Sequence, residues 1–338
     1  MQPRTAIKTT AMSEQGSSPT TNGWNTYWQG IRDSDNASAG GFGHAGFAAL
    51  WTTAVTEFLA ARGDSSPRIL DIGTGNGAVL EALGRVSATQ FENVTCTDIS
   101  AAAIDNVKQH FPGISGIVAD AKNIPSEAGQ FDLITSQFGI EYAGPEAIDE
   151  AVRLLSPGGS LFFLMHIQPG ALHNECAAAV DALRRTRDAR FIELTRDLFE
   201  TGFAAVGGAD RAPYEAAAKA MNPAIRELEA VLTEHGEHVA GDSIVTLHAT
   251  VQNMHSRMQH YDPAEVFAWL DLMQSELAKH EARMTSMQQA SLDSDSFKQT
   301  CERLENLGVK IERAQAAQVQ GEKLPLAWLL QATLPKTT

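Results

Sequence analysis

A short apolar run that closes on a cluster of glycines is the feature that most constrains this chain. Residues 68–77 read RILDIGTGNG, so a strand-like segment ends near Asp71 and is followed at once by Gly73, Gly75 and Gly77. A strand, close-set glycines and a helix place backbone N–H groups at the helix start with no side chains in the way. Such a loop can approach a nucleotide or an amino-acid-like cofactor, although a tight turn alone would also explain it. The spacing is neither the G-x-G-x-x-G of dinucleotide-binding loops nor a P-loop with its Lys-Ser/Thr pair.

Strand-like and helix-like segments alternate from residue 68 onward. Apolar strands separated by amphipathic helices indicate βαβ units and a parallel sheet. Five such strands are expected, over residues 68–73, 94–99, 114–120, 131–137 and 160–166. The SPGG stretch at 156–159 is expected to be a turn before the fifth strand.

The alternation stops between residues 170 and 292, where long helical segments predict an all-helical cap inserted after the fifth strand. It resumes with a helix, then two strand-like stretches at 309–319 and 326–335 that predict an antiparallel edge hairpin. The predicted fold class is therefore α/β, with a doubly wound, mostly parallel seven-stranded sheet. The expected regions are a disordered tail (1–22), an N-terminal helical lid segment (23–65), a Rossmann-like core (66–169 and 293–338) and the helical cap (170–292).

Composition narrows the classes of function. The formal net charge of −15 would repel polyanions, which disfavours a nucleic-acid partner. The three cysteines are far apart and form no CxxC pair, which fits a reducing cytosol and predicts a cytoplasmic protein. No apolar run approaches the roughly 20 residues that cross a bilayer, so no membrane partner is expected. The first 22 residues lack the apolar core of a secretory signal.

Two further carboxylates strengthen the cofactor reading. Asp98 ends the second expected strand, where a ribose-binding acid belongs in such folds. Asp120 ends the third, where it could accept a hydrogen bond from an adenine amine. Each could instead be a turn or N-cap aspartate. Together with Asp71, however, they lie at the carboxyl ends of strands in one sheet, the rim at which open α/β sheets bind ligands.

The ordered motifs LDIGTGNG, CTDIS, VADAKNIP, FDLITSQFGIEY and LLSPGGSLFFL resemble those of the class I S-adenosylmethionine-dependent methyltransferases. The resemblance spans roughly residues 66–165 and, more weakly, the closing hairpin. It implies S-adenosyl-L-methionine as cofactor and S-adenosyl-L-homocysteine as product. The residues it assigns to cofactor binding are Asp71, Gly73, Thr74, Gly75, Asp98, Ile99, Asp120, Ala121, Ser136 and Gln137. Among these, Asp98 would hold the ribose, Ile99 would pack on the adenine, and Ser136 and Gln137 would flank the methionine part.

Candidates for the acceptor site follow the fourth and fifth strands. Phe138, Glu141 and Tyr142 come directly after the fourth strand, and His166 ends the fifth. An imidazole with an ordinary pKa near 6.5 could serve as general base, so His166, Tyr142 and Glu141 are the catalytic candidates. His166 could equally be a strand-end residue bonded to backbone, and the other two could simply begin a loop.

The aromatic residues Trp24, Tyr27 and Trp28 have the spacing of one helix face and could close over the cofactor as a lid. They could as easily pack on the core. The histidines between 170 and 292 have no accompanying metal-site pattern, so no metal is expected. The Met254–Met258 and Met284–Met287 pairs are expected in the core rather than in a ligand pocket.

The leading hypothesis is transfer of a methyl group to an O, S or N atom of a small molecule held between the sheet rim and the helical cap. The DPPY-type tetrad of nucleic-acid amino-methyltransferases is missing, since the sequence after the fourth strand reads SQFG. Two alternatives stay open: a protein side-chain methyltransferase, and a scaffold that binds the cofactor without catalysis. The Ala-rich helices of the cap could also form a homodimer interface.

Overall fold

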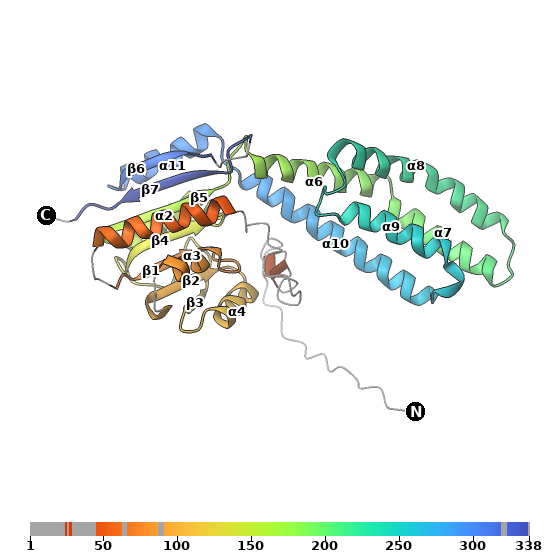
Figure 1. Cartoon of the computed structure of the whole chain (residues 1–338), viewed down its shortest axis with the longest axis horizontal. Coiled ribbons are helices and arrows are strands. Elements are labelled where there is room, and N and C mark those ends of the chain that lie inside the picture. Colours follow the sequence, from red (N-terminus) through yellow and green to blue (C-terminus); the bar gives the residue numbers. More distant parts are fainter. Residues whose placement is uncertain are drawn as a thin grey trace, which may run out of the picture.

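The computed structural model describes residues 24–25, 27–28, 45–62, 66–86, 91–318 and 323–336. The predicted tail at 1–22 lies outside the described residues. Two bodies lie side by side in Figure 1: a sheet covered by helices, and an elongated group of helices. No helix in the described ranges is long and apolar enough to cross a membrane.

A seven-stranded sheet with the order β3-β2-β1-β4-β5-β7-β6 forms the first body. Its strands are β1 (Ile69–Ile72), β2 (Val94–Asp98), β3 (Ser115–Val118), β4 (Phe131–Gln137), β5 (Leu155–Met165), β6 (Lys310–Ala317) and β7 (Ala327–Thr333). The first five are parallel, and β7 runs antiparallel between β5 and β6. The predicted fold class, including its antiparallel edge hairpin, is confirmed. The strand order reverses between β1 and β4, the point at which such sheets open a crevice for ligands.

Helices cover both faces of this sheet (Figure 1). One layer contains α2 (Ala45–Arg62), α3 (Ala78–Val86) and α4 (Ala101–His110), which share one apolar cluster. The other contains α5 (Pro145–Leu154) and α11 (Ser294–Asn306). Trp51 on α2 and Leu80 on α3 are almost fully buried, as expected of helices that press an apolar face on strands. Short 3₁₀ turns lie at η1 (Phe91–Asn93), η2 (Ile140–Ala143) and η3 (Met258–His260).

The predicted turn at 156–159 is wrong, because β5 begins at Leu155 and runs through it. The register against β4 jumps from Phe131↔Leu155 to Leu133↔Ser160, so these residues form a bulge within the strand. Gly158 has φ +82°, and its N–H donates to the Leu334 carbonyl at 2.7 Å. This hydrogen bond to the residue that follows β7 therefore keeps residues 156–159 in the sheet.

Five helices lie between β5 and α11, and we call them the helical arm: α6 (Ala171–Asp188), α7 (Phe191–Val206), α8 (Ala212–His235), α9 (Ser243–Ser256) and α10 (Pro263–Ala290). The arm has its own apolar core, which supports our proposal that residues 170–292 form an inserted subdomain. Arg190 adopts φ +55° between α6 and α7 and so separates these two helices. The Met254–Met258 and Met284–Met287 pairs pack in the protein interior, as predicted.

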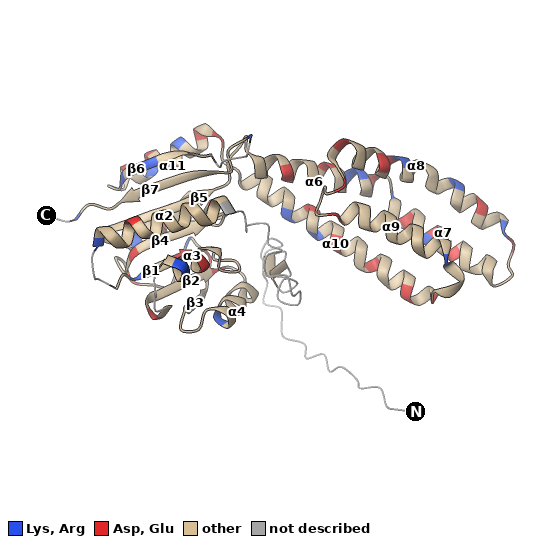
Figure 2. Ribbon diagram, in the orientation of Figure 1, with Lys and Arg blue, Asp and Glu red and all other residues tan. Residues whose placement is uncertain are grey.

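The arm leaves and rejoins the sheet at one place. The N–H of Gln168 donates to the Leu292 carbonyl, and the N–H of Leu292 donates to the His166 carbonyl, each at 2.9 Å. From there the arm extends away from the sheet instead of folding over it, which corrects the expected cap (Figure 1). Acidic and basic residues are interspersed along its helices (Figure 2). Arg185 of α6, for example, pairs with Glu227 and Glu234 of α8.

Candidate active site

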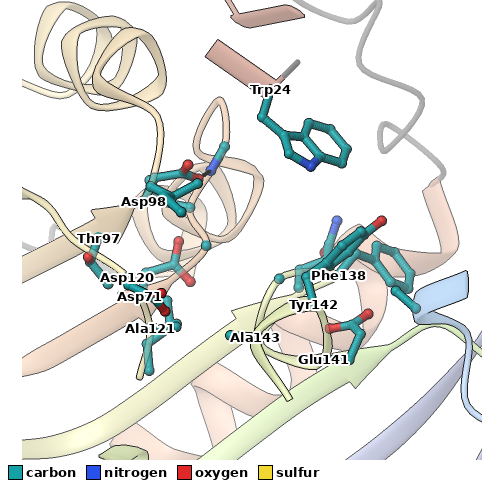
Figure 3. A pocket seen from close by; sticks show the side chains of 18 of the residues that line it. Trp24, Asp71, Thr97, Asp98, Asp120, Ala121, Phe138, Glu141, Tyr142 and Ala143 are labelled. Carbon is teal, nitrogen blue, oxygen red and sulfur yellow. Dashed lines mark hydrogen bonds between the residues drawn. The ribbon is translucent and has the colours of Figure 1, made fainter. Parts of the chain in front are cut away.

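A cavity of about 560 Å³ lies at the carboxyl ends of β1, β2 and β4, within the size range of small-molecule sites. Its walls differ in chemistry (Figure 3). Asp71, Asp98 and Asp120 lie on one side, which we call the acidic half. Phe138 and Tyr142 lie on the other, the aromatic half. The fold therefore brings together residues that the sequence placed at the ends of different strands.

The glycine loop is held by backbone contacts that side chains would prevent. The N–H groups of Gly73 and Thr74 both donate to the Thr97 carbonyl, at 2.8 and 3.1 Å. Gly73 has φ +67°, and a Cβ there would lie 2.8 Å from Cα of Gly139. Gly75 has φ +52°, and a Cβ there would lie 2.8 Å from the Trp28 ring. Glycine is required at both positions by conformation and by space.

Gly77 has a structural role. A Cβ at this position would lie 2.6 Å from the Phe111 ring at the end of α4. The third glycine therefore serves the packing of α3 against its neighbour, while Gly73, Thr74 and Gly75 line the cavity.

Asp98 at the end of β2 is oriented by two backbone donors. Its Oδ2 accepts from the N–H of Gly75 at 3.0 Å, and its Oδ1 accepts from the N–H of Ser100 at 2.9 Å. Burial raises its pKa, and these backbone hydrogen bonds oppose the increase. Each carboxylate oxygen has a second lone pair, so the group can still accept hydrogen bonds from a vicinal diol in the cavity.

Asp71 at the end of β1 is the most perturbed acid of the cavity. Burial raises its pKa to about 7, partly opposed by the nearby hydroxyls of Thr74 and Thr135. Thr135 donates to Oδ1 at 2.8 Å, whereas Oδ2 is buried and has no hydrogen-bond partner among the described residues. An ammonium group in the cavity would satisfy this oxygen and favour its ionised form.

Three residues line the outer end of the acidic half. Ile99 is 41% exposed and lines the cavity with an apolar surface. Asp120 and Ala121 also line the cavity. Asp120 is exposed, and its Oδ1 accepts from the N–H of Lys122 at 3.0 Å, so it makes the predicted turn contact as well.

Of the neighbouring residues Ser136 and Gln137, Gln137 lines the cavity and Ser136 does not. Ser136 is fully buried and is not on the cavity wall, which corrects its expected contact with the cofactor. Its hydroxyl donates to the Ile72 carbonyl at 2.8 Å and accepts from the N–H of Ile140 at 3.0 Å, so its polar capacity is used within the fold. Gln137 does line the cavity, and Trp51 of α2 donates to its side-chain oxygen.

The aromatic half is built on η2 and the end of β4. Phe138 adopts φ +54°, an uncommon backbone conformation for a bulky residue that is often found at functional sites. Tyr142 and Glu141 of η2 also line the cavity. The His166 ring lies 4.3 Å from the Phe138 ring but one layer behind the wall. Nδ1 of His166 lies 2.8 Å from Oε1 of Glu141, a pairing that the sequence could not reveal.

The N-terminal aromatic segment is anchored to α4 by Asn25, which the sequence did not single out. Its Oδ1 accepts from the Ser100 hydroxyl at 3.0 Å and from the N–H of Ala102 at 3.1 Å. Trp24 and Trp28 line the cavity, and Trp24 meets the Tyr142 ring edge-on at 5.7 Å. Trp24 thus lies across the opening between the two halves (Figure 3).

Tyr27 is outside the cavity wall and contacts the helical arm instead. The Arg283 guanidinium of α10 lies 4.5 Å from the centre of its ring, within cation–π range. Three residues near the end of the same helix, Ser286, Gln289 and Ala290, line the cavity. This contribution of α10 was missed because nothing local in the sequence distinguishes that turn from the rest of a long helix. No group of three metal-ligating side chains occurs in the described part of the chain.

Comparison with known proteins places this core in a family. Residues 70–163 match the family described as "Methyltransferase domain". Over 114 residues the chain is 30% identical to demethylmenaquinone methyltransferase of Beutenbergia cavernae, covering 33% of this chain and 45% of that protein. Over 216 residues it is 28% identical to ubiquinone/menaquinone biosynthesis C-methyltransferase UbiE of Pseudomonas paraeruginosa, covering 60% and 78%.

The chain spans about half the length of most of the curated relatives it matches. A crystal structure of a SAM-dependent methyltransferase from Aquifex aeolicus covers 84% of this chain and 89% of its own, with 11% identity and a TM-score of 0.39, too loose a likeness to carry an argument. The chain carries a class I S-adenosylmethionine-dependent methyltransferase domain, and its cofactor is S-adenosylmethionine. The acidic half fits that group, since Oδ2 of Asp71 has no hydrogen-bond partner among the described residues and Asp98 can accept hydrogen bonds from a diol.

Proposed function

We propose that this protein transfers a methyl group from S-adenosylmethionine to a small-molecule acceptor bound in the aromatic half of the cavity. The observation that carries the proposal is the continuity of the two halves. One cavity contains the carboxylates that suit the cofactor and, opposite them, aromatic walls with no other assigned ligand.

The bound cofactor supplies an electrophilic methyl group on a sulfonium. The residues of this chain orient the cofactor and enclose the site. Asp98 orients the ribose end, and Asp71 orients the amino-acid end, so the methyl group would face Phe138 and Tyr142. Trp24 and the last turns of α10 reduce access of water from the open side. Alignment of this kind can account for several kcal/mol of a methyl-transfer barrier.

The site also supports a small rather than a macromolecular acceptor. The cavity has a volume of about 560 Å³, and its lining includes three acids in the cofactor half, which would repel a polyanion. The relatives named above are called quinone-pathway methyltransferases, so carbon joins O, S and N among the acceptor atoms to be tested. Cytoplasmic location and a homodimer through the arm stay predictions.

The first experiment is calorimetric titration of the full chain with S-adenosylmethionine and S-adenosylhomocysteine. Both should bind, and the Asp98→Ala variant should lose binding while it keeps its circular dichroism spectrum. Labelled methyl transfer is then measured separately on metabolite and protein fractions of a cell extract. Absence of binding by the wild type would refute the proposal. Label that enters only protein would replace the small acceptor by a protein side chain.

A further inference from the structure

A small polar cluster lies behind the aromatic half, where the sheet meets the helical arm. It consists of Glu141 on η2, His166 directly after β5 and His173 in the first turn of α6. Each contributes one buried atom that has no hydrogen-bond partner in the described ranges: Oε2 of Glu141, Nε2 of His166 and Nδ1 of His173. The side chains of Glu141 and His166 are each only 1% exposed. Native proteins leave few such atoms unsatisfied, because each costs about 1–3 kcal/mol.

Glu141 fixes the orientation of His166. One oxygen, Oε1, lies 2.8 Å from Nδ1 of the ring and also accepts from the backbone N–H of His166 at 2.9 Å. In the tautomer with its proton on Nδ1, the ring donates a hydrogen bond to this carboxylate oxygen. The neutral ring then presents a bare lone pair at Nε2. This arrangement is the one in which a carboxylate prepares an imidazole to take a proton.

His173 adds a second imidazole from the arm. Its pKa is lowered by burial and by the neighbouring His166, so its ring is neutral at neutral pH. No group of three or more His, Cys, Asp or Glu side chains among the described residues is placed to hold a metal ion. The unpartnered atoms therefore suit a ligand that brings its own proton donor.

The aromatic side chains around His166 favour a ligand whose remaining part is a flat, apolar ring. The centre of the Phe138 ring lies 4.3 Å from the centre of the His166 ring. The Tyr142 ring meets the His166 ring edge-on, with 5.8 Å between the ring centres. Burial, followed by the charge of Glu141, raises the pKa of Tyr142 well above its ordinary value, so its hydroxyl stays neutral. A carboxylate or thioether acceptor would bring no proton to Nε2. An amine acceptor would also bring a proton, and an amine probe is therefore included in the test below.

We propose that this cluster receives the hydroxyl of a phenolic methyl acceptor, with Nε2 of His166 accepting its proton and His173 completing the polar contacts. The inference rests on the proposed methyl transfer. Phe138 lines the cavity and separates it from His166, so the proposal requires the Phe138 side chain to move aside before the acceptor ring can reach Nε2. The helical arm would then contribute to acceptor binding through its first turn as well as through α10.

The step balances without another reactant. The phenolic O–H bond breaks and its proton goes to Nε2 of His166, which forms an imidazolium beside Glu141. The phenolate, through oxygen or a ring carbon that then loses its own proton to solvent, bonds to the methyl carbon. The methyl–sulfur bond breaks and its electron pair stays on sulfur.

The test uses binding of simple probes to the full chain saturated with S-adenosylhomocysteine, so no acceptor need be identified. The probes are 4-nitrophenol, its methyl ether 4-nitroanisole, which lacks the proton, and 4-nitroaniline. The phenol should bind at least about tenfold tighter than the ether, the equivalent of one charge-assisted hydrogen bond. Its absorption spectrum should shift toward the phenolate form on binding.

The variants assign this preference to the cluster. His166→Gln should abolish both the preference and the spectral shift, and His173→Gln should weaken the preference several-fold. The fully exposed His238, paired only with Asp242 on the arm, gives the control His238→Gln, which should retain both. Binding of S-adenosylhomocysteine should be unchanged in all three.

Some outcomes would overturn the proposal. They are equal binding of phenol and ether by the wild type, no binding of the phenol, tighter binding of the aniline, or a preference that survives His166→Gln. Because the wild-type probe comparison needs no variant, poor folding of His166→Gln would not rescue the idea. Loss of S-adenosylhomocysteine binding by the wild type would instead refute the methyltransferase proposal itself.

Discussion

The buried carboxyl group of Asp71 predicts a measurable conflict between stability and cofactor binding. Burial raises its pKa from 3.8 to about 7 in the folded protein. Since the pKa of Asp71 is higher in the folded than in the unfolded protein, the contribution of this carboxyl group to stability is fully present below pH 4. That contribution is lost as the pH rises toward 7. At about 1.4 kcal/mol for each pH unit, the loss amounts to about 4 kcal/mol at pH 8.

The variant Asp71→Asn isolates this effect, because asparagine keeps the oxygen that accepts from Thr135 and cannot ionise. Urea unfolding of both proteins without cofactor is measured between pH 5 and pH 8.5. The variant should gain on the wild type by about 1.4 kcal/mol for each pH unit up to pH 7, and by a constant amount above it. Titrating groups that do not interact with Asp71 affect both proteins equally and cancel in the difference, whereas Asp98 is coupled to Asp71 and adds a smaller change.

Cofactor binding should change in the opposite direction. An ammonium beside Oδ2 favours the ionised carboxylate, so wild-type affinity for S-adenosylhomocysteine should rise as pH increases through 7. The variant should bind at least about tenfold more weakly at pH 8 and show no such rise. Parallel stability curves for the two proteins, or a pH-independent wild-type affinity, would refute this account of Asp71.

Two further perturbations test the glycine loop and the contact between the N-terminal aromatic segment and the helical arm. Gly75→Ala introduces a Cβ at φ +52° and 2.8 Å from the Trp28 ring, so it should cost about 1–3 kcal/mol of stability and weaken cofactor binding, by urea unfolding and calorimetry. Arg283→Met removes the cation over Tyr27, so it should release the aromatic segment from α10 at a cost of about 1 kcal/mol, seen as faster proteolysis near Tyr27.

Matched controls separate these effects from general damage. Gly84→Ala lies within α3, where a Cβ would make only ordinary contact with Phe91, and should leave binding unchanged and stability equal or higher. Arg226→Met is the control for Arg283, on α8 of the same arm. Normal cofactor affinity in Gly75→Ala would contradict the geometry described for the glycine loop. Unchanged proteolysis in Arg283→Met would contradict the contact described between Tyr27 and α10.

Local patterns in the sequence were sufficient for the sheet and for the acidic half of the cavity. The strand and helix periodicities give the parallel sheet, and parallel strands bring their carboxyl ends to one rim. Asp71, Asp98 and Asp120 could therefore be placed together before any contact was known. Two residues do not follow this pattern. Ser136 comes at the end of a strand, but its hydroxyl is hydrogen-bonded to backbone groups, and Gly77 provides space for the Phe111 ring instead of lining the cavity.

The sequence by itself determined the kind of sheet, the cofactor loop and the acids around it, because these depend on neighbours a few residues apart. Only the tertiary structure decided that the helices after β5 extend as an arm, that α10 returns to the cavity through Ser286 and Gln289, and that Glu141 holds His166. Such contacts join residues far apart in the chain. They depend on the direction in which whole helices pack, which no local pattern encodes.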